Sequence, residues 1–171
     1  MRLLPSSPYS ASKAAADLAA LSYSRTFGLN VTVSRCSNNF GPWQHPEKLI
    51  GTVISNLIAG RLVPIYGDGT QRRHWIYVDE HNDAIMDILE RGESGKIYNI
   101  SPPGQNWITN IQLTRFIIER FGKNPDEVIK FVKDRPGHDV SYFMTGTDFC
   151  RKYVFWENDM IKTIDWYKEN L

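Results

Sequence analysis

The sequence predicts an α/β fold. Short segments rich in β-branched residues recur along the chain, segments with apolar residues at helical spacing alternate with them, and turn-forming residues separate the two kinds. At 171 residues, the chain is long enough for one domain, or for one domain and part of another. Hydrophobic residues make up 42% of the chain, which is enough to build a buried core.

The first helix is predicted by its ends. Ser7 suits the N-cap, Pro8 suits the first helical position, and Gly28 suits the exit. On this helix Tyr9 and Lys13 are four residues apart, so both side chains share one face. A cation held near a phenol favours the phenolate, and such a pair suits general acid or base catalysis. The spacing alone favours an ordinary surface helix, on which the two side chains have no catalytic role.

The remaining elements follow in order. Alternating or β-branched residues predict strands at 30–36, 62–66, 73–78, 96–100 and 128–132. Helices are expected from about Lys48, from a cap at Asp79 and from a cap at Asn110, and an amphipathic helix ends the chain. Polar loops are expected at 37–46, 102–110 and 134–139. No glycine-rich phosphate loop follows an early strand, and the strands before residue 60 are too few for a complete doubly wound sheet.

Composition and charge exclude several classes of function. The net charge of +1 gives no reason to expect a nucleic acid or an acidic membrane as partner. Cys36 and Cys150 lie far apart without a metal-ligand pattern, so we expect no metal site and free thiols in a reducing cytoplasm. The longest apolar region, 49–59, is too short to span a membrane, and no signal peptide is visible. A cytoplasmic protein is therefore expected.

Several motifs, taken in this order, resemble one family. They are PSSPYSASK at 5–13, SNNFGP at 37–42, PEKLI at 46–50, PIYGDG at 64–69, RHWIYV at 73–78, YNI at 98–100 and DRPGHD at 134–139. Together they resemble the dTDP-glucose 4,6-dehydratases, a family of extended short-chain dehydrogenases/reductases, over roughly residues 5 to 143. SNNFGP and DRPGHD are more specific than the Tyr/Lys pair, which many relatives share. His74 departs from the family, which usually has Asp there.

The resemblance implies a partial Rossmann-type fold, made of the tyrosine helix and a late strand, plus a small α/β domain that binds a nucleotide-sugar. Residues 1–47 would be the remnant of the NAD-binding domain and residues 48–171 the substrate domain. The family's glycine-rich NAD loop and its eliminating Asp/Glu pair are absent from this sequence. We therefore expect a C-terminal portion of the enzyme, which as an isolated chain is oligomeric or marginally stable because strand edges and an apolar face stay uncovered.

The resemblance also implies roles for individual residues. Tyr9 would be the active-site base, Lys13 would hydrogen-bond the nicotinamide ribose, and Asn39 would contact the cofactor NAD near the nicotinamide. The positions that match the nucleotide-sugar site are Asn38, Lys48, Leu49, Pro64, Ile65, Tyr66, Arg73, Asn110, Asp134, Arg135 and His138. Cationic side chains suit a diphosphate, and amides and ring faces suit a sugar or base. Two simpler readings stay open, in which Asn38 only caps a loop turn and Tyr66 only packs under the Gly67 turn.

The expected function is the conversion of dTDP-glucose to dTDP-4-keto-6-deoxyglucose by internal hydride transfer through NAD, a lyase reaction, with this isolated chain itself inactive. Two alternatives remain: a non-catalytic nucleotide-sugar-binding fragment, and another nucleotide-sugar epimerase or dehydratase. The motifs leave the choice between thymidine and uridine nucleotides open. A homodimer is the assembly that the resemblance allows.

Overall fold

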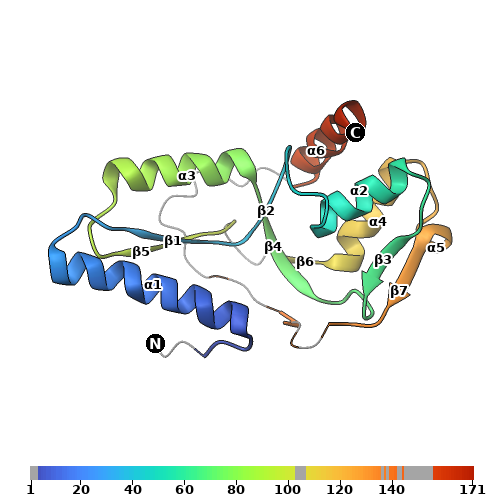
Figure 1. Ribbon diagram of the computed structural model, residues 1–171. Helices are drawn as coiled ribbons and strands as arrows, with labels where there is room; N and C mark the ends of the chain where they lie inside the picture. The colour runs from blue at the N-terminus through green and yellow to red at the C-terminus, as the bar shows by residue number, and fades with distance from the viewer. Residues whose placement is uncertain (1–3, 103–106, 136, 138, 142–143, 145–155) are drawn as a thin grey trace.

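The first unit of the fold is a three-layer α/β arrangement. The computed structural model describes residues 4–102, 107–135, 137, 139–141, 144 and 156–171. In it β1 (Val33–Cys36) pairs in parallel with β5 (Ile97–Ile100). Helix α1 (Pro8–Phe27) covers one side of these strands and α3 (Val78–Arg91) covers the other (Figure 1). The predicted α/β class is confirmed.

The second unit contains two further small sheets. Strand β4 (Arg72–Tyr77) lies between β2 (Asn38–Phe40), which is parallel to it, and β6 (Trp107–Thr109), which is antiparallel. Strands β3 (Val63–Tyr66) and β7 (Ile129–Val132) form a parallel pair. The helices of this unit are α2 (Leu49–Ile58), α4 (Asn110–Arg120), the short α5 (Pro125–Val128) and α6 (Trp156–Asn170).

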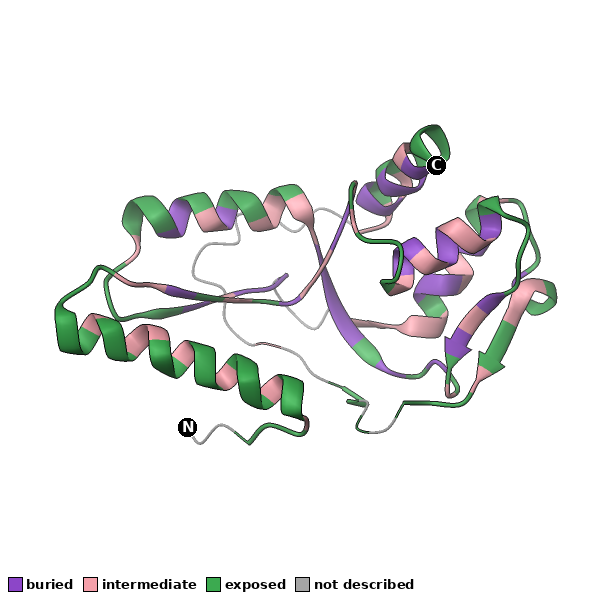
Figure 2. Cartoon of the chain, viewed as in Figure 1, coloured by how far each residue is buried: buried purple, intermediate pink, exposed green. Residues whose placement is uncertain are grey.

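The two hydrophobic cores meet at β4. Trp75 is 5% exposed and packs in the larger cluster, which α2, α4 and α6 supply with Ile54, Ile117 and Ile164. Ile76 is fully buried in the smaller cluster, on the side of α3. Successive residues of a strand point to opposite faces, so one strand closes both cores. This explains why β4 is buried on both faces (Figure 2).

The predicted ends of the first helix are confirmed. The Ser7 hydroxyl accepts a hydrogen bond from the Ser10 N–H at 3.1 Å, and Pro8 is the first helical residue. Gly28 adopts a left-handed conformation, with φ of 66°, and its N–H donates to the Ser24 carbonyl at 2.9 Å. Glycine adopts this conformation without steric cost, which is why the helix ends there.

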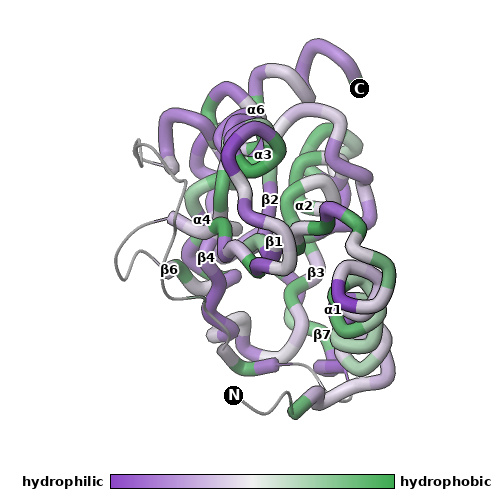
Figure 3. The backbone as a smooth tube through the Cα atoms, turned by 90° about the vertical axis from the view of Figure 1, so that its left-hand side faces the viewer, coloured by the Kyte–Doolittle hydropathy of each residue, from purple (hydrophilic) through white to green (hydrophobic). Residues whose placement is uncertain are grey.

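Helix α1 covers its strands without being covered itself. None of its residues, all of which the structure describes, is buried, and Leu18 and Phe27 are 61% and 66% exposed. The view in Figure 3 again places β1 between α1 and α3. Exposure of this size agrees with an apolar face that needs a partner, and the expectation of marginal stability or oligomerisation stays a prediction.

Two helix caps differ from the sequence-based predictions. Tyr77, not Asp79, is the N-cap of α3, so Asp79 lies in the first turn, where its negative charge still favours the helix dipole. Thr109, not Asn110, caps α4, because its hydroxyl accepts from the Gln112 N–H at 3.2 Å and the Gln112 side chain returns the bond.

Two short strands lie where loops were expected. Strand β2 lies in the predicted loop 37–46, and β6 in the predicted loop 102–110, whose residues 103–106 are outside the described part. The predicted domain boundary after residue 47 stays a prediction, although the pairing of β5 with β1 returns residues 97–100 to the first sheet. No described helix combines the length and apolar character needed to cross a membrane.

Candidate functional site

The Tyr/Lys pair lies at the start of α1. Tyr9 is the second residue of the helix and is 73% exposed, and Lys13 follows one turn later. The Lys13 charge reaches Cys36, the last residue of β1, where it lowers the pKa of the thiol, although burial outweighs it and raises that pKa overall. The pair therefore lies beside the carboxyl end of a parallel strand, which is where open α/β sheets place their ligands.

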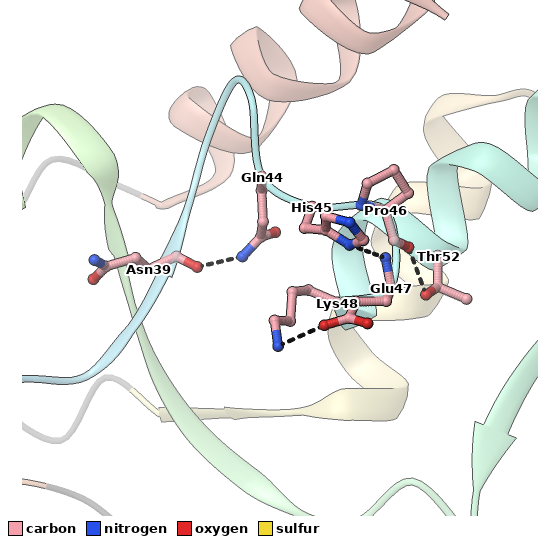
Figure 4. A network of polar contacts seen from close by, with 7 residues as sticks. All are labelled: Asn39, Gln44, His45, Pro46, Glu47, Lys48 and Thr52. Carbon is pink, nitrogen blue, oxygen red and sulfur yellow. Dashed lines mark hydrogen bonds and ion pairs between the residues drawn. The ribbon is translucent and has the colours of Figure 1, made fainter. Parts of the chain in front are cut away.

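Asn39 carries a free acceptor beside this edge. It lies in β2, opposite Ile76 of β4, and its main-chain carbonyl accepts a hydrogen bond from the Gln44 side-chain amide at 2.7 Å (Figure 4). Its side-chain oxygen is buried and has no hydrogen-bond partner among the described residues. A buried acceptor of this kind is costly unless a donor reaches it, so the residue fits a cofactor that presents an N–H or O–H group.

The loop before α2 is fixed by local bonds (Figure 4). The Thr52 hydroxyl donates to the Pro46 carbonyl at 2.9 Å, and a Cβ on Gly51 would lie 2.9 Å from the Pro46 Cα. Lys48 is the N-cap residue of α2, and its ammonium lies 3.1 Å from the Glu47 carboxylate, whose pKa it lowers. This ion pair is exposed and weak, so the Lys48 ammonium remains accessible to an anionic ligand.

Residues from three distant predicted segments meet beyond β3. The Arg135 guanidinium lies 4.8 Å from the centre of the Tyr66 ring. The Asp134 carboxylate accepts from the Gln71 side chain at 3.1 Å, and the Asn110 side chain donates to the same amide at 3.5 Å. Four predicted site residues are thus brought together around Gln71, which the motifs did not single out.

Arg73 is a buried connector in this structure. It is 6% exposed, and its guanidinium donates to the carbonyls of Arg72 and Asp139, each at 2.7 Å. The Ser6 hydroxyl, three residues before Tyr9, donates to the Asp139 carboxylate at 3.0 Å. Strand β4, the 139–141 segment and the approach to α1 are therefore joined.

The other predicted positions differ in accessibility. Ile65 is 1% exposed and packs in the larger core, so its side chain is part of that core and only its backbone can face a ligand. Leu49 and Pro64 are partly buried, and Asn38 lies in β2 opposite Trp75. His138 lies outside the described residues.

His74 stands at the junction of the two units. It is 4% exposed, and its Nδ1 lies 3.1 Å from the Ser101 hydroxyl, just beyond β5. Burial disfavours the charged ring and lowers its pKa. Among the described residues, no group of His, Cys, Asp and Glu could hold a metal ion.

Known proteins match almost the whole length of the chain. The family model described as "NAD dependent epimerase/dehydratase family" matches residues 2–101. The dTDP-glucose 4,6-dehydratases of Streptomyces niveus and Escherichia coli are 40% and 41% identical to this chain, each over 97% of it, and the matches cover 50% and 49% of those relatives. The chain thus spans about half the length of the curated relatives it matches, in their C-terminal portion.

Solved structures of the same family have the same fold as this chain. The dTDP-glucose 4,6-dehydratase of Streptomyces venezuelae, solved with NAD bound, is 40% identical with a TM-score of 0.93, over 99% of this chain and 53% of that one. The UDP-glucose 4-epimerase of Thermotoga maritima is 25% identical with a TM-score of 0.86, over 98% of this chain and 55% of that one. The chain belongs to the NAD-dependent epimerase/dehydratase family.

Proposed function

We propose that this chain forms the nucleotide-sugar half of a dTDP-glucose 4,6-dehydratase, an NAD-dependent lyase that produces dTDP-4-keto-6-deoxyglucose. The observation that carries the proposal is the meeting of Tyr66, Asn110, Asp134 and Arg135, which come from two separate motifs of that family and from one further position that matches its nucleotide-sugar site. The chain is 40% identical to a dehydratase and 25% identical to an epimerase, which supports dehydration over epimerisation as the reaction.

The nucleotide would be held by cations and one ring. Arg135 and Lys48 present exposed positive charge suited to a diphosphate, and the half-exposed Tyr66 ring offers a face to a base or sugar. Arg73 is buried and donates to two carbonyls, and a role on the diphosphate would add to these bonds, because a guanidinium carries five N–H donors. Its more immediate role is to hold the 139–141 segment against β4.

The proton chemistry would belong to α1. Tyr9 is exposed at the start of the helix and would take the proton of the sugar 4-hydroxyl, and Lys13 lies one turn away on the same helix. NAD, when bound, would supply the hydride acceptor for this oxidation and the hydride donor for the later reduction. Lys13 would hydrogen-bond the nicotinamide ribose of NAD. The buried side-chain oxygen of Asn39 would accept a hydrogen bond from NAD.

Calorimetric titration of the purified chain with dTDP, UDP and NAD tests the proposal. Saturable binding of dTDP with clear discrimination against UDP supports the dehydratase assignment, and preference for UDP would transfer it to a uridine-sugar enzyme. The variant Arg135→Ala should weaken dTDP binding, whereas Arg61→Ala, on the exposed turn after α2, should leave it unchanged. Absence of binding to a chain shown to be folded would refute the proposal.

A non-catalytic nucleotide-sugar-binding fragment is the second candidate, because the chain spans about half of its relatives. Turnover of dTDP-glucose in the presence of NAD separates the two. If the chain is a dehydratase, it forms product and the Tyr9→Phe variant does not. If it is a non-catalytic fragment, it binds dTDP and forms no product. A homodimer stays a proposal that sedimentation of the same sample tests.

A further inference from the structure

Gln71 is a buried polar residue at the meeting point of three segments. It is 5% exposed and lies between the turn after β3 and the start of β4. Its side-chain Nε2 donates to the Tyr66 carbonyl at 3.3 Å and to the Asp134 Oδ2 at 3.1 Å. Its Oε1 accepts from the Asn110 side chain at 3.5 Å, and its main-chain carbonyl accepts from the Asn110 N–H at 3.0 Å.

These bonds fix the orientation of the Gln71 carboxamide. Both of its N–H groups face acceptors and its oxygen faces a donor, so exchanging the two ends would place like groups against each other. A buried amide is tolerated only when such bonds are made. The side chain therefore has one favourable orientation here, and the segments bound to it are held relative to one another.

The bonds lead directly to the Tyr66–Arg135 pair. Gln71 holds the Tyr66 carbonyl, and it holds one oxygen of Asp134 while the other oxygen accepts from the Arg135 N–H at 2.8 Å. The Arg135 guanidinium stacks on the Tyr66 ring at 4.8 Å. The Gln71 side-chain amide thus restrains the main chain at Tyr66 directly and, through Asp134, the main chain at Arg135.

We infer that Gln71 is a positioning residue, which sets the Tyr66 ring and the Arg135 guanidinium at the spacing that a nucleoside diphosphate requires. The inference rests on the proposed function for the identity of the ligand. It does not rest on it for the positioning itself, which can be measured without any ligand.

Gln71→Glu is the sharpest test, because it keeps the shape of the side chain but replaces the Nε2 amide donor by a carboxylate oxygen. That oxygen would face the Asp134 carboxylate and the Tyr66 carbonyl, which are both acceptors. Adding Asp134→Asn reverses the pair, since the new amide can donate to the new carboxylate and its oxygen can still accept from Arg135. The double variant has the net charge of the wild type. Gln71→Met removes the donors without adding charge and serves where the glutamate variant fails to fold.

The first readout is NMR of the Arg135 side chain, whose signals the Tyr66 ring current shifts upfield. We expect this shift in the wild type, its loss in Gln71→Glu and Gln71→Met, and its partial return in the double variant, in which the bond between positions 71 and 134 is restored but the Tyr66 carbonyl still lacks its donor. Asn124→Ala is the matched control, because it removes the side-chain cap of α5 at a distance from the pair and should leave the Arg135 shift unchanged.

The second readout is dTDP affinity. Gln71→Met should weaken binding about three- to tenfold, the range expected for one hydrogen-bonding group. In an Arg135→Ala background the same substitution should cause a smaller further loss, because only the Tyr66 ring remains to be positioned, whereas a merely structural role would give the full loss. Unchanged Arg135 signals in Gln71→Glu and Gln71→Met would overturn the inference, as would additive losses in affinity. If the wild type binds no dTDP while the Arg135 signals respond, the proposed function fails and the positioning role stands.

Discussion

Gly41 in the SNNFGP motif is expected to be essential for stability. Its φ is 149°, a conformation that L side chains rarely adopt, and a Cβ there would lie 2.5 Å from the Val78 Cγ1 and 3.3 Å from a ring carbon of Tyr77. Backbone strain contributes about 1–3 kcal/mol and overpacking about 1–3 kcal/mol, so Gly41→Ala should lower the free energy of unfolding by about 2–6 kcal/mol. This is a large fraction of the roughly 5–15 kcal/mol that holds a typical domain together.

Urea denaturation of matched variants separates the two contributions. Gly60 also has a positive φ, 66°, but a Cβ there meets nothing within 4 Å, so Gly60→Ala should cost only about 1–2 kcal/mol. Adding Val78→Ala to Gly41→Ala removes the clashing methyl group and should recover the overpacking part, a favourable coupling of about 1–3 kcal/mol. A Gly41→Ala midpoint no lower than that of Gly60→Ala would refute the reasoning.

Three further substitutions test the description of the fold. His74 has a lowered pKa because it is buried, so its neutral form stabilises the fold fully above its ordinary pKa of about 6.5 and stability falls as pH drops below it, by at most about 1.4 kcal/mol per pH unit. His74→Gln should flatten this dependence in urea titrations between pH 7.5 and 5.5, and an unchanged slope would contradict it. Thr109→Ala removes the α4 cap and should cost about 1 kcal/mol in the same assay, whereas a neutral result would assign the cap to Asn110. Trp43 has φ of 64° and lies 4.9 Å from the Trp166 ring, so Trp43→Gly should exchange about 1–2 kcal/mol of strain for a similar loss of ring contact, and a loss well above 2 kcal/mol would show that the contact dominates.

Local signals made the first helix predictable. Ser7, Pro8 and Gly28 act through bonds and dihedral angles of their own neighbours, so each could be interpreted without knowing the fold. The short strands β2 and β6 could not be, because three residues in a polar segment become a strand only when β4 lies beside them. Their pairing partners are more than 30 residues away in the sequence, and no local pattern encodes that distance.

The candidate site shows the same division. Tyr66, Arg135 and Asn110 were predicted because they match positions of the nucleotide-sugar site in the family that the sequence resembles, and their side chains fit such a ligand. Gln71 was missed because its chemistry is ordinary and its partners lie 39 and 63 residues away. The one available signal in the sequence was that the polar Gln71 directly precedes β4, a strand whose residues suggest burial. Ile65 illustrates the converse, since it lies inside a predicted motif but belongs to the core.

Strand β4 links the two units closely enough that they should not move independently. Trp75 closes one core and Ile76 the other, and a shift of the strand by one residue would place each side chain in the core that is packed for the other. On the same strand Arg73 binds the Asp139 carbonyl, and Asp139 in turn accepts from Ser6 next to α1. A ligand that restrains Asp139 would therefore also restrain the start of the helix that carries Tyr9. Nucleotide binding and placement of the predicted base are in this way expected to be coupled through one strand and one buried arginine.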